Sequence, residues 1–272
     1  MDRRPIGIFD SGLGGLTAVK EAVRRMPGED IVFFGDTGRV PYGTRSTPTI
    51  IRYALEDMRF LKRFDIKTAV VACGTVSTTA LPELRKNFDL PIYGVTEAAV
   101  DAAVRASRSG RIGVIGTNAS IRSGTYERLL RERRADAEVV SVPCPLLVPL
   151  VENGRFNPED PVVRLILEEY LAPVTEFGAD ALILGCTHYP LLRAAVAAVC
   201  GPEVALIDPG RETADVLSRE LAERGLAADP ARKGSLRCFV SDDAESFSHF
   251  GGMFLGRDIE ADVSLCDISA EK

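Results

Sequence analysis

Two cysteines stand at matching points of the sequence and could act as a chemical pair. Cys73 ends the run TAVVAC and Cys186 ends the run ALILGC, and each is followed within two residues by a threonine and then by a helical pattern. A lone cysteine at a strand end is more often a small buried hydrophobe than a nucleophile. The N-terminus of a helix, however, lowers the pKa of a thiol and favours the thiolate. The repeated arrangement therefore predicts a pair of reactive thiols.

The spacing around these cysteines excludes some thiol chemistries and favours another. A phosphatase-like cysteine needs an arginine six positions later, where this chain has Thr79 and Leu192. A hydrolase needs only one thiol. Two thiols on opposite faces of one carbon suit a reaction that removes a proton from one side and returns a proton to the other. That reaction is racemisation. The other four cysteines, Cys144, Cys200, Cys238 and Cys266, are predicted to be structural, and Cys144 in particular because no helix start follows it.

Short β-branched runs alternate with longer amphipathic stretches, as in a parallel sheet with crossover helices. The fold class is therefore α/β. Helical periodicity is clearest at 16–25, 49–64 and 161–177. The predicted strands lie at 5–9, 31–34, 68–72, 91–95, 111–115, 138–142, 181–184 and 204–207.

The first four strands and the next four look like two copies of one plan. IGIFDSG at 6–12 matches IGVIGTN at 112–118, and TAVVACGT matches ALILGCTH. DIVFFGD and EVVSVPC, and LPIYGVT and VALIDPG, pair more weakly. The pattern predicts two similar doubly wound domains, 1–97 with 208–272 and 98–207, and the segment after Ile207 is expected to pack back onto the first. Ligands of open parallel sheets bind beyond the carboxyl ends of the strands, so the site is expected in a cleft between the domains.

Composition sets the broad class of the protein. With 46% hydrophobic and 26% charged residues the 272-residue chain is expected to fold and bury a core. A net charge of -6 argues against nucleic acid. No stretch approaches the roughly 20 apolar residues of a membrane span, and no signal peptide is recognisable, so a cytoplasmic location is predicted. Widely spaced cysteines and only two histidines favour reduced thiols and no metal.

The glycine-rich segment DSGLGGLT at 10–17 raises the idea of a dinucleotide site, which its spacing does not support. A GxGxxG fingerprint would need a glycine where Thr17 stands, and Asp10 would repel a pyrophosphate. A tight turn with Asp10 or Ser11 as a helix cap is the ordinary interpretation.

Four segments, in matching order and spacing over nearly the whole chain, closely resemble the glutamate racemase family. They are DSGLGGLT, FFGDTGRVPYG at 33–43, CPLLVPLVENG at 144–154 and LILGCTHYPLL at 182–192. The resemblance implies two α/β domains related by a pseudo-twofold, an active site between them, no pyridoxal phosphate and no metal, so no cofactor is expected. It also implies D-glutamate supply for peptidoglycan and the cell wall. The predicted partner is the small-molecule substrate, and a homodimer stays open.

The resemblance also implies a role for each site residue. Cys73 would take the proton from D-glutamate and Cys186 from L-glutamate. Asp10 would support Cys73, His188 and Glu152 would support Cys186, and Asp36 would be a further polar contributor. Alone, His188 could be a core histidine, Glu152 a surface carboxylate and Asp36 a turn residue. The residues implied to hold the substrate are Ser11, Pro41, Tyr42, Gly43, Thr75, Thr117, Ser120 and Thr187, together with Asp10, Cys73, Gly74, Cys186 and His188.

The chain departs from the family beside the first cysteine. The family usually has Cys-Asn-Thr, whereas here the run is Cys73-Gly74-Thr75. The missing amide donor predicts weaker substrate binding or an altered choice of substrate, and a positive φ at Gly74 is the competing explanation. Two alternatives to glutamate racemisation stay open: an aspartate racemase, and a non-catalytic protein that binds small dicarboxylates.

Overall fold

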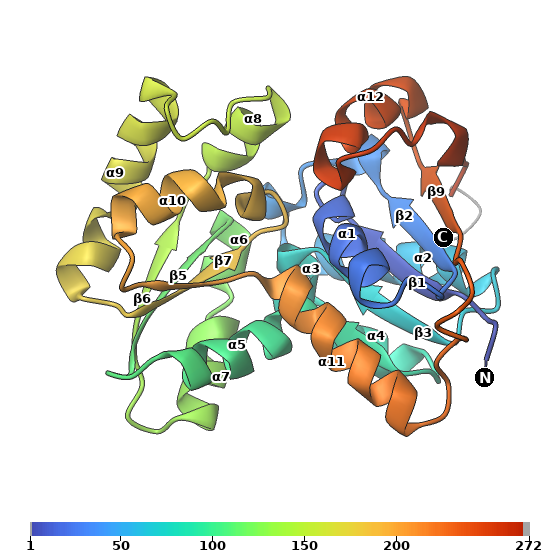
Figure 1. Ribbon diagram of the computed structural model, residues 1–272, viewed down its shortest axis with the longest axis horizontal. Helices are drawn as coiled ribbons and strands as arrows, with labels where there is room; N and C mark the ends of the chain where they lie inside the picture. Colours follow the sequence, from blue (N-terminus) through green and yellow to red (C-terminus); the bar gives the residue numbers. More distant parts are fainter. Residues whose placement is uncertain (1, 269–272) are drawn as a thin grey trace.

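A computed structural model describes residues 2–268 and contains two sheets, one in each half of the molecule (Figure 1). The six-stranded sheet has the order β10-β9-β2-β1-β3-β4 and the four-stranded sheet the order β6-β5-β7-β8. Every pairing between neighbouring strands is parallel. The strands are β1 (Ile6–Asp10), β2 (Ile31–Gly35), β3 (Thr68–Val71), β4 (Ile92–Gly94), β5 (Arg111–Gly116), β6 (Glu138–Pro143), β7 (Ala181–Gly185), β8 (Ala205–Ile207), β9 (Leu236–Val240) and β10 (Val263–Leu265).

Helices connect the parallel strands and cover both sheets (Figure 1). The α-helices are α1 (Leu16–Arg25), α2 (Thr47–Lys62), α3 (Gly74–Thr79), α4 (Leu81–Asn87), α5 (Val95–Ala106), α6 (Asn118–Arg122), α7 (Thr125–Arg133), α8 (Leu147–Glu152), α9 (Pro161–Phe177), α10 (Arg193–Cys200), α11 (Pro209–Glu223) and α12 (Ala244–Leu255). Short 3₁₀ turns are η1 (Thr37–Arg39), η2 (Tyr42–Thr44), η3 (Tyr189–Leu192) and η4 (Glu260–Asp262). Of the helices predicted from periodicity, 16–25 and 161–177 coincide with α1 and α9, and 49–64 is α2 displaced by two residues.

The two halves share one strand plan. β2-β1-β3-β4 in the first sheet and β6-β5-β7-β8 in the second have the same order, with the first strand of each set between the second and the third. The predicted α/β class with two similar, mainly parallel sheets is therefore confirmed. Cys73 follows β3 and Cys186 follows β7, so the two thiols occupy equivalent strand ends.

Two additional strands extend the first sheet beyond this common plan. β9 pairs with β2, and β10 pairs with β9, so the segment after Ile207 does return to the first half as expected. α11 crosses between the halves (Figure 1) and packs against both α1 and α5. The domain boundaries at 97–98 and 207–208 remain a prediction.

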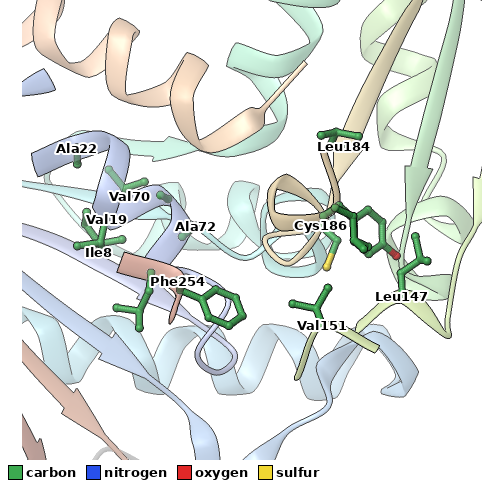
Figure 2. Close-up of a cluster of buried hydrophobic side chains, with 14 of the residues drawn as sticks. Ile8, Val19, Ala22, Val70, Ala72, Leu147, Val151, Leu184, Cys186 and Phe254 are labelled. Carbon is green, nitrogen blue, oxygen red and sulfur yellow. The ribbon is translucent and has the colours of Figure 1, made fainter. Parts of the chain in front are cut away.

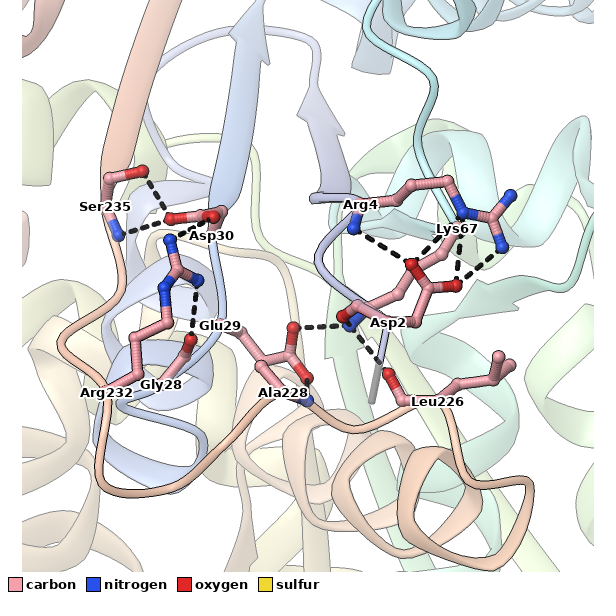
Figure 3. A network of polar contacts seen from close by, with 10 residues as sticks. All are labelled: Asp2, Arg4, Gly28, Glu29, Asp30, Lys67, Leu226, Ala228, Arg232 and Ser235. Atoms are coloured by element: carbon pink, nitrogen blue, oxygen red, sulfur yellow. Dashed lines mark hydrogen bonds and ion pairs between the residues drawn. The ribbon is translucent and has the colours of Figure 1, made fainter.

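A buried ion pair ties the returning segment to the amino ends of the first sheet (Figure 3). The ammonium group of Lys67 is fully buried and donates to Glu29 Oε2 at 2.6 Å and to the backbone oxygens of Asp2 and Leu226. Oε1 of Glu29 accepts from the backbone N–H of Ala228. A buried charge is tolerated only when it is paired and hydrogen-bonded, and here those partners come from segments far apart in the sequence.

The hydrophobic core continues from the first half into the second (Figure 2). Side chains beneath the first sheet, such as Ile8 and Val19, belong to the same cluster as Leu147 and Val151 of α8. Cys186 lies within this cluster and is only 8% exposed. One thiol therefore sits at the edge of continuous apolar packing. Within the part of the chain that the structure describes, no helix combines the length and hydropathy needed to cross a membrane.

Candidate active site

A cavity of about 360 Å³ lies at the carboxyl ends of strands from both sheets. Thirteen of the fifteen site residues implied by the sequence line it. These are Asp10, Ser11, Pro41, Tyr42, Gly43, Cys73, Gly74, Thr75, Thr117, Glu152, Cys186, Thr187 and His188. The structure thus brings both thiols to one enclosed space, as the matching positions predict. Asp36 and Ser120 do not line it.

Cys73 stands between β3 and α3 beside a buried carboxyl group. Its Sγ is 3.4 Å from Oγ of Ser11. Asp10 at the end of β1 is 1% exposed, and its Oδ2 accepts from the backbone N–H of Gly12 at 3.0 Å. Oδ1 of Asp10 is buried without a hydrogen-bond partner among residues 2–268. The Asp10 side chain therefore offers one unsatisfied oxygen at the cavity wall.

Burial and the charge of Asp10 raise the pKa of Cys73 to about 12. This is opposite to the sequence expectation that the start of a helix would favour the thiolate. The helix does begin there, with Cys73 as the N-cap of α3, but α3 has only six residues. Desolvation of the sulfur and a neighbouring carboxylate outweigh so short a helix. Burial likewise raises the pKa of Asp10. In this structure Cys73 is a thiol at neutral pH.

Cys186 has an imidazole as its neighbour instead of a carboxyl group. Nδ1 of His188 lies 3.8 Å from Sγ of Cys186, and Nε2 lies 3.0 Å from Oε1 of Glu152. Burial alone would lower the pKa of His188, but the contacts with Cys186 and Glu152 raise it to about 10. His188 is therefore protonated at neutral pH. Its Nε2–H is donated to Glu152, and its Nδ1–H faces both the sulfur and Oγ1 of Thr187, which is 3.5 Å away. The Glu152 side chain is 43% exposed. The series of contacts from Cys186 through His188 to Glu152 therefore reaches the surface at the end of α8.

A pair of hydroxyl groups joins the two halves across the cavity. Oγ1 of Thr75 on α3 and Oγ1 of Thr117 after β5 are 2.9 Å apart. Thr117 is the N-cap of α6 and accepts from the backbone N–H of Ser120, whose hydroxyl lies 3.0 Å away. Ser120 therefore acts on the cavity through Thr117 and does not line it.

Asp36, expected near the site, lies beneath the turn that lines it. It is fully buried and accepts from Ser241 Oγ at 2.8 Å, from Arg39 Nε at 2.5 Å and, in a short bond, from the hydroxyl of Tyr42. The same hydroxyl also contacts Asp57 Oδ2 at 3.1 Å. Asp36 thus holds Tyr42 in place below the cavity wall, where the Val40–Pro41 peptide bond is cis.

Gly74 forms a direct backbone contact between the halves. It is the first residue of α3 and does not have a positive φ, so the conformational explanation for this glycine is wrong. A Cβ atom there would lie 2.5 Å from the carbonyl oxygen of Gly185 and 3.3 Å from its carbon. A larger side chain therefore needs the halves to separate. The available space limits the size of the side chain at position 74. The loss of an amide donor is therefore not the whole explanation for the glycine.

Cys144, predicted to be structural, also lines the cavity. The expectation that no helix follows it was wrong, since α8 begins at Leu147. Its pairing with Asp36 in the repeat of DIVFFGD as EVVSVPC was the signal that it ends an equivalent strand. The other lining residues that the sequence did not single out are Gly12, Val40, Thr44, Asn118, Pro145, Val148 and Pro149. Among the described residues, no group of three or more His, Cys, Asp or Glu side chains could hold a metal ion.

Comparison with known proteins defines the class to which this fold and site belong. Residues 10–217 match the family model described as Asp/Glu/Hydantoin racemase. The match covers more than half of the chain. The chain belongs to this family and is an isomerase.

Similar proteins over the full length are named glutamate racemase. The one from Geobacter metallireducens is 44% identical, with all of both chains covered. The crystal structure of glutamate racemase isoform RacE1 from Bacillus anthracis has a TM-score of 0.92 at 38% identity, with 98% of each chain covered. That of the Francisella tularensis enzyme in complex with D-glutamate has a TM-score of 0.91 at 34% identity, over 99% of this chain and 100% of that one. Within its family the chain therefore falls among the glutamate racemases.

Proposed function

We propose that this chain interconverts L- and D-glutamate by acid/base catalysis with Cys73 and Cys186, without a cofactor. The observation that carries the proposal is that the two thiols, at equivalent strand ends of two halves built alike, line one cavity. A carbon held between them can lose a proton to one sulfur and receive a proton from the other. The names of the relatives support glutamate as the substrate.

The proposed cycle needs one thiolate and one thiol at every turnover. In the L-to-D direction the thiolate of Cys186 forms an S–H bond with the α-proton of L-glutamate while the C–H bond breaks. The electron pair left on the α-carbon then takes the proton of the Cys73 thiol on the opposite face, which leaves Cys73 as the thiolate. The D-to-L direction runs the same steps backwards. No proton is gained or lost overall.

The neighbours of each sulfur fit these roles. The protonated imidazole of His188, with a pKa of about 10, places positive charge beside Cys186. Cys73, with its pKa raised to about 12, is a thiol that can donate. In the L-to-D direction the cation beside Cys186 favours proton abstraction by that sulfur, and Cys73 is the thiol that donates. Asp36 acts as a support of the Tyr42 turn and not as a group that contacts the reacting carbon.

The cavity offers groups of the right kind for an amino acid with two carboxylates. The unpartnered Oδ1 of Asp10 can accept from the α-ammonium group. Hydroxyl groups of Ser11, Thr75, Thr117 and Thr187 line the same wall and can donate to carboxylates. A volume of about 360 Å³ lies at the lower end of the usual range for small-molecule sites.

We infer that the product D-glutamate serves peptidoglycan synthesis in the cytoplasm.

The test is the circular dichroism of glutamate incubated with the purified, dialysed chain. The signal of either enantiomer should decay to zero without added pyridoxal phosphate and in the presence of a chelator. In ²H₂O, deuterium should enter the α-position of the product. Faster decay with aspartate would favour an aspartate racemase, and ligand binding without deuterium uptake would favour a dicarboxylate-binding protein. Size-exclusion chromatography with light scattering would decide whether the chain forms a homodimer.

A further inference from the structure

The turn between β1 and α1 contains two adjacent glycines whose missing side chains leave room for two different active-site groups. A Cβ on Gly14 would lie 2.6 Å from Cε1 and Nδ1 of His188, and closer still to Oγ1 of Thr187. A Cβ on Gly15 would lie 2.5 Å from Cβ of Asp10 and 3.1 Å from its Cγ. Carbon atoms not bonded to each other normally pack at about 3.5 to 4.0 Å. Either added methyl group therefore has to displace an active-site side chain.

Backbone conformation does not explain these glycines. Neither has a positive φ, and Gly15 has φ -59° and ψ -15°, which any residue can adopt. Glycine is needed at these two positions because a side chain would not fit there. The turn is also tied across the molecule, since the hydroxyl of Thr17 donates to the carbonyl oxygens of Gly14 and of Thr187, each at 2.9 Å. The first half thus packs backbone against the loop that carries His188.

We propose that Gly14 and Gly15 are positioning residues, with Gly14 setting the place of His188 beside Cys186 and Gly15 setting the place of Asp10 beside Cys73. One turn of the first half then controls the geometry at both thiols. Nδ1 of His188, the atom that a methyl group on Gly14 would meet, is the atom that faces Cys186 Sγ at 3.8 Å. The expected loss of activity rests on the proposed function. The expected displacement of His188 and Asp10 rests on packing alone.

The experiment compares Gly14→Ala and Gly15→Ala with the control Gly38→Ala. Gly38 is exposed in η1, after β2, and the atoms nearest to its Cβ would belong to Ser241 and Asp242, at 3.3 Å or more. Misplacing a catalytic group by about 1 Å can cost on the order of 100-fold in rate. We expect a loss of that order in kcat for both active-site variants and none for Gly38→Ala.

Isotope effects separate the two glycines. With α-deuterated L-glutamate, abstraction falls to Cys186, and with the D-enantiomer to Cys73. Gly14→Ala should raise the isotope effect on the L-enantiomer and lower that on the D-enantiomer, because the Cys186 step becomes slower. Gly15→Ala should do the opposite. The same pattern in both variants would indicate a general loosening of the turn and would overturn the proposal.

Histidine NMR tests the geometry without using activity. The chain has only two histidines, so His249 on α12 is an internal control in ¹⁵N-histidine-labelled protein. The groups facing His188 are Cys186, the hydroxyl of Thr187, Glu152 of α8, Asp10 of β1 and the ring of Phe254 on α12. Gly14→Ala should move the His188 signals and leave those of His249. Unmoved His188 signals in folded Gly14→Ala protein would defeat the proposal, even if the wild-type chain did not racemise glutamate.

A third variant keeps the test decisive if Gly14→Ala does not fold. Thr17→Val removes the hydroxyl that joins Gly14 to Thr187 and replaces it with a methyl group of similar shape. We expect a smaller shift of the same His188 signals and isotope effects changed in the direction of Gly14→Ala. Isotope effects equal to those of the wild type would contradict the assigned role.

Discussion

Cys73 and Cys186 follow equivalent strands, yet their surroundings carry opposite charge. Beside Cys73 stands the buried carboxyl group of Asp10, and beside Cys186 stands the imidazole of His188, whose pKa of about 10 makes it cationic. The strand order is the same in the two halves, but the ionisable groups beside the two sulfurs differ. The proposed mechanism uses one sulfur as a base and the other as an acid, and this difference in surroundings suits it. Duplication can therefore supply two matching strand ends, while the neighbouring residues give each sulfur a different electrostatic environment.

The largest effect is expected when either thiol is removed. This test shows whether both halves are required for racemisation. Cys73→Ala and Cys186→Ala should each lower racemisation in both directions by on the order of 1,000-fold or more, because every turnover needs one sulfur to accept a proton and the other to donate one. Circular dichroism of each enantiomer measures this. Cys200→Ala, at the half-buried end of α10, is the control. A single-alanine variant with near-normal turnover would contradict the two-thiol mechanism.

The next effect should distinguish the two halves. His188→Asn removes the cation beside Cys186, and Asp10→Asn removes the carboxylate beside Cys73; each should lower kcat by about 100-fold. The enantiomers have equal free energy in water, so kcat/KM stays equal in the two directions, and the asymmetry must appear in the isotope effects. His188→Asn should raise the effect on α-deuterated L-glutamate, and Asp10→Asn that on D-glutamate. Identical patterns would show that the opposite charges are not used separately.

The contact of Gly74 with Gly185 joins the two halves, and changing it should have a smaller effect than changing the groups beside the sulfurs. In Gly74→Asn the new Cβ meets the carbonyl oxygen of Gly185, so the halves must separate or the backbone must shift. Overpacking of this kind typically costs about 1 to 3 kcal/mol. We expect a melting temperature lower by several degrees and a raised KM for glutamate. A lower KM with unchanged stability would instead support the idea that the amide restores a donor to the substrate.

A further effect concerns the pH dependence of stability on the Cys186 side. The folded-state pKa of His188 is about 10, above its ordinary value of 6.5. Its protonation therefore contributes stability that is fully present below about pH 6.5 and is lost as the pH rises through 10. Urea unfolding of wild type and His188→Asn should show a difference in the free energy of unfolding that shrinks over this range. His249→Asn is the matched control. A difference independent of pH would mean that His188 is not held protonated.

The sequence by itself determined the elements and the matching thiols. Periodicity and composition act between residues close in the chain, so the alternation of strands and helices, and the strand ends that carry Asp10, Cys73 and Cys186, could be predicted. The relation between IGIFDSG and IGVIGTN anticipated the common strand order. The C-terminal segment was also expected in the first half, where β9 and β10 lie.

Only the tertiary structure decided what surrounds each sulfur. That Gly74 touches Gly185 and that Gly14 leaves room for His188 are contacts between segments distant in sequence. Such contacts depend on how the two sheets pack against each other. The raised pKa of Cys73 was missed because the start of α3 is visible in the sequence, whereas desolvation of the sulfur and the position of Asp10 depend on tertiary packing. Asp10 comes beside Cys73 because β1 and β3 pair in the first sheet.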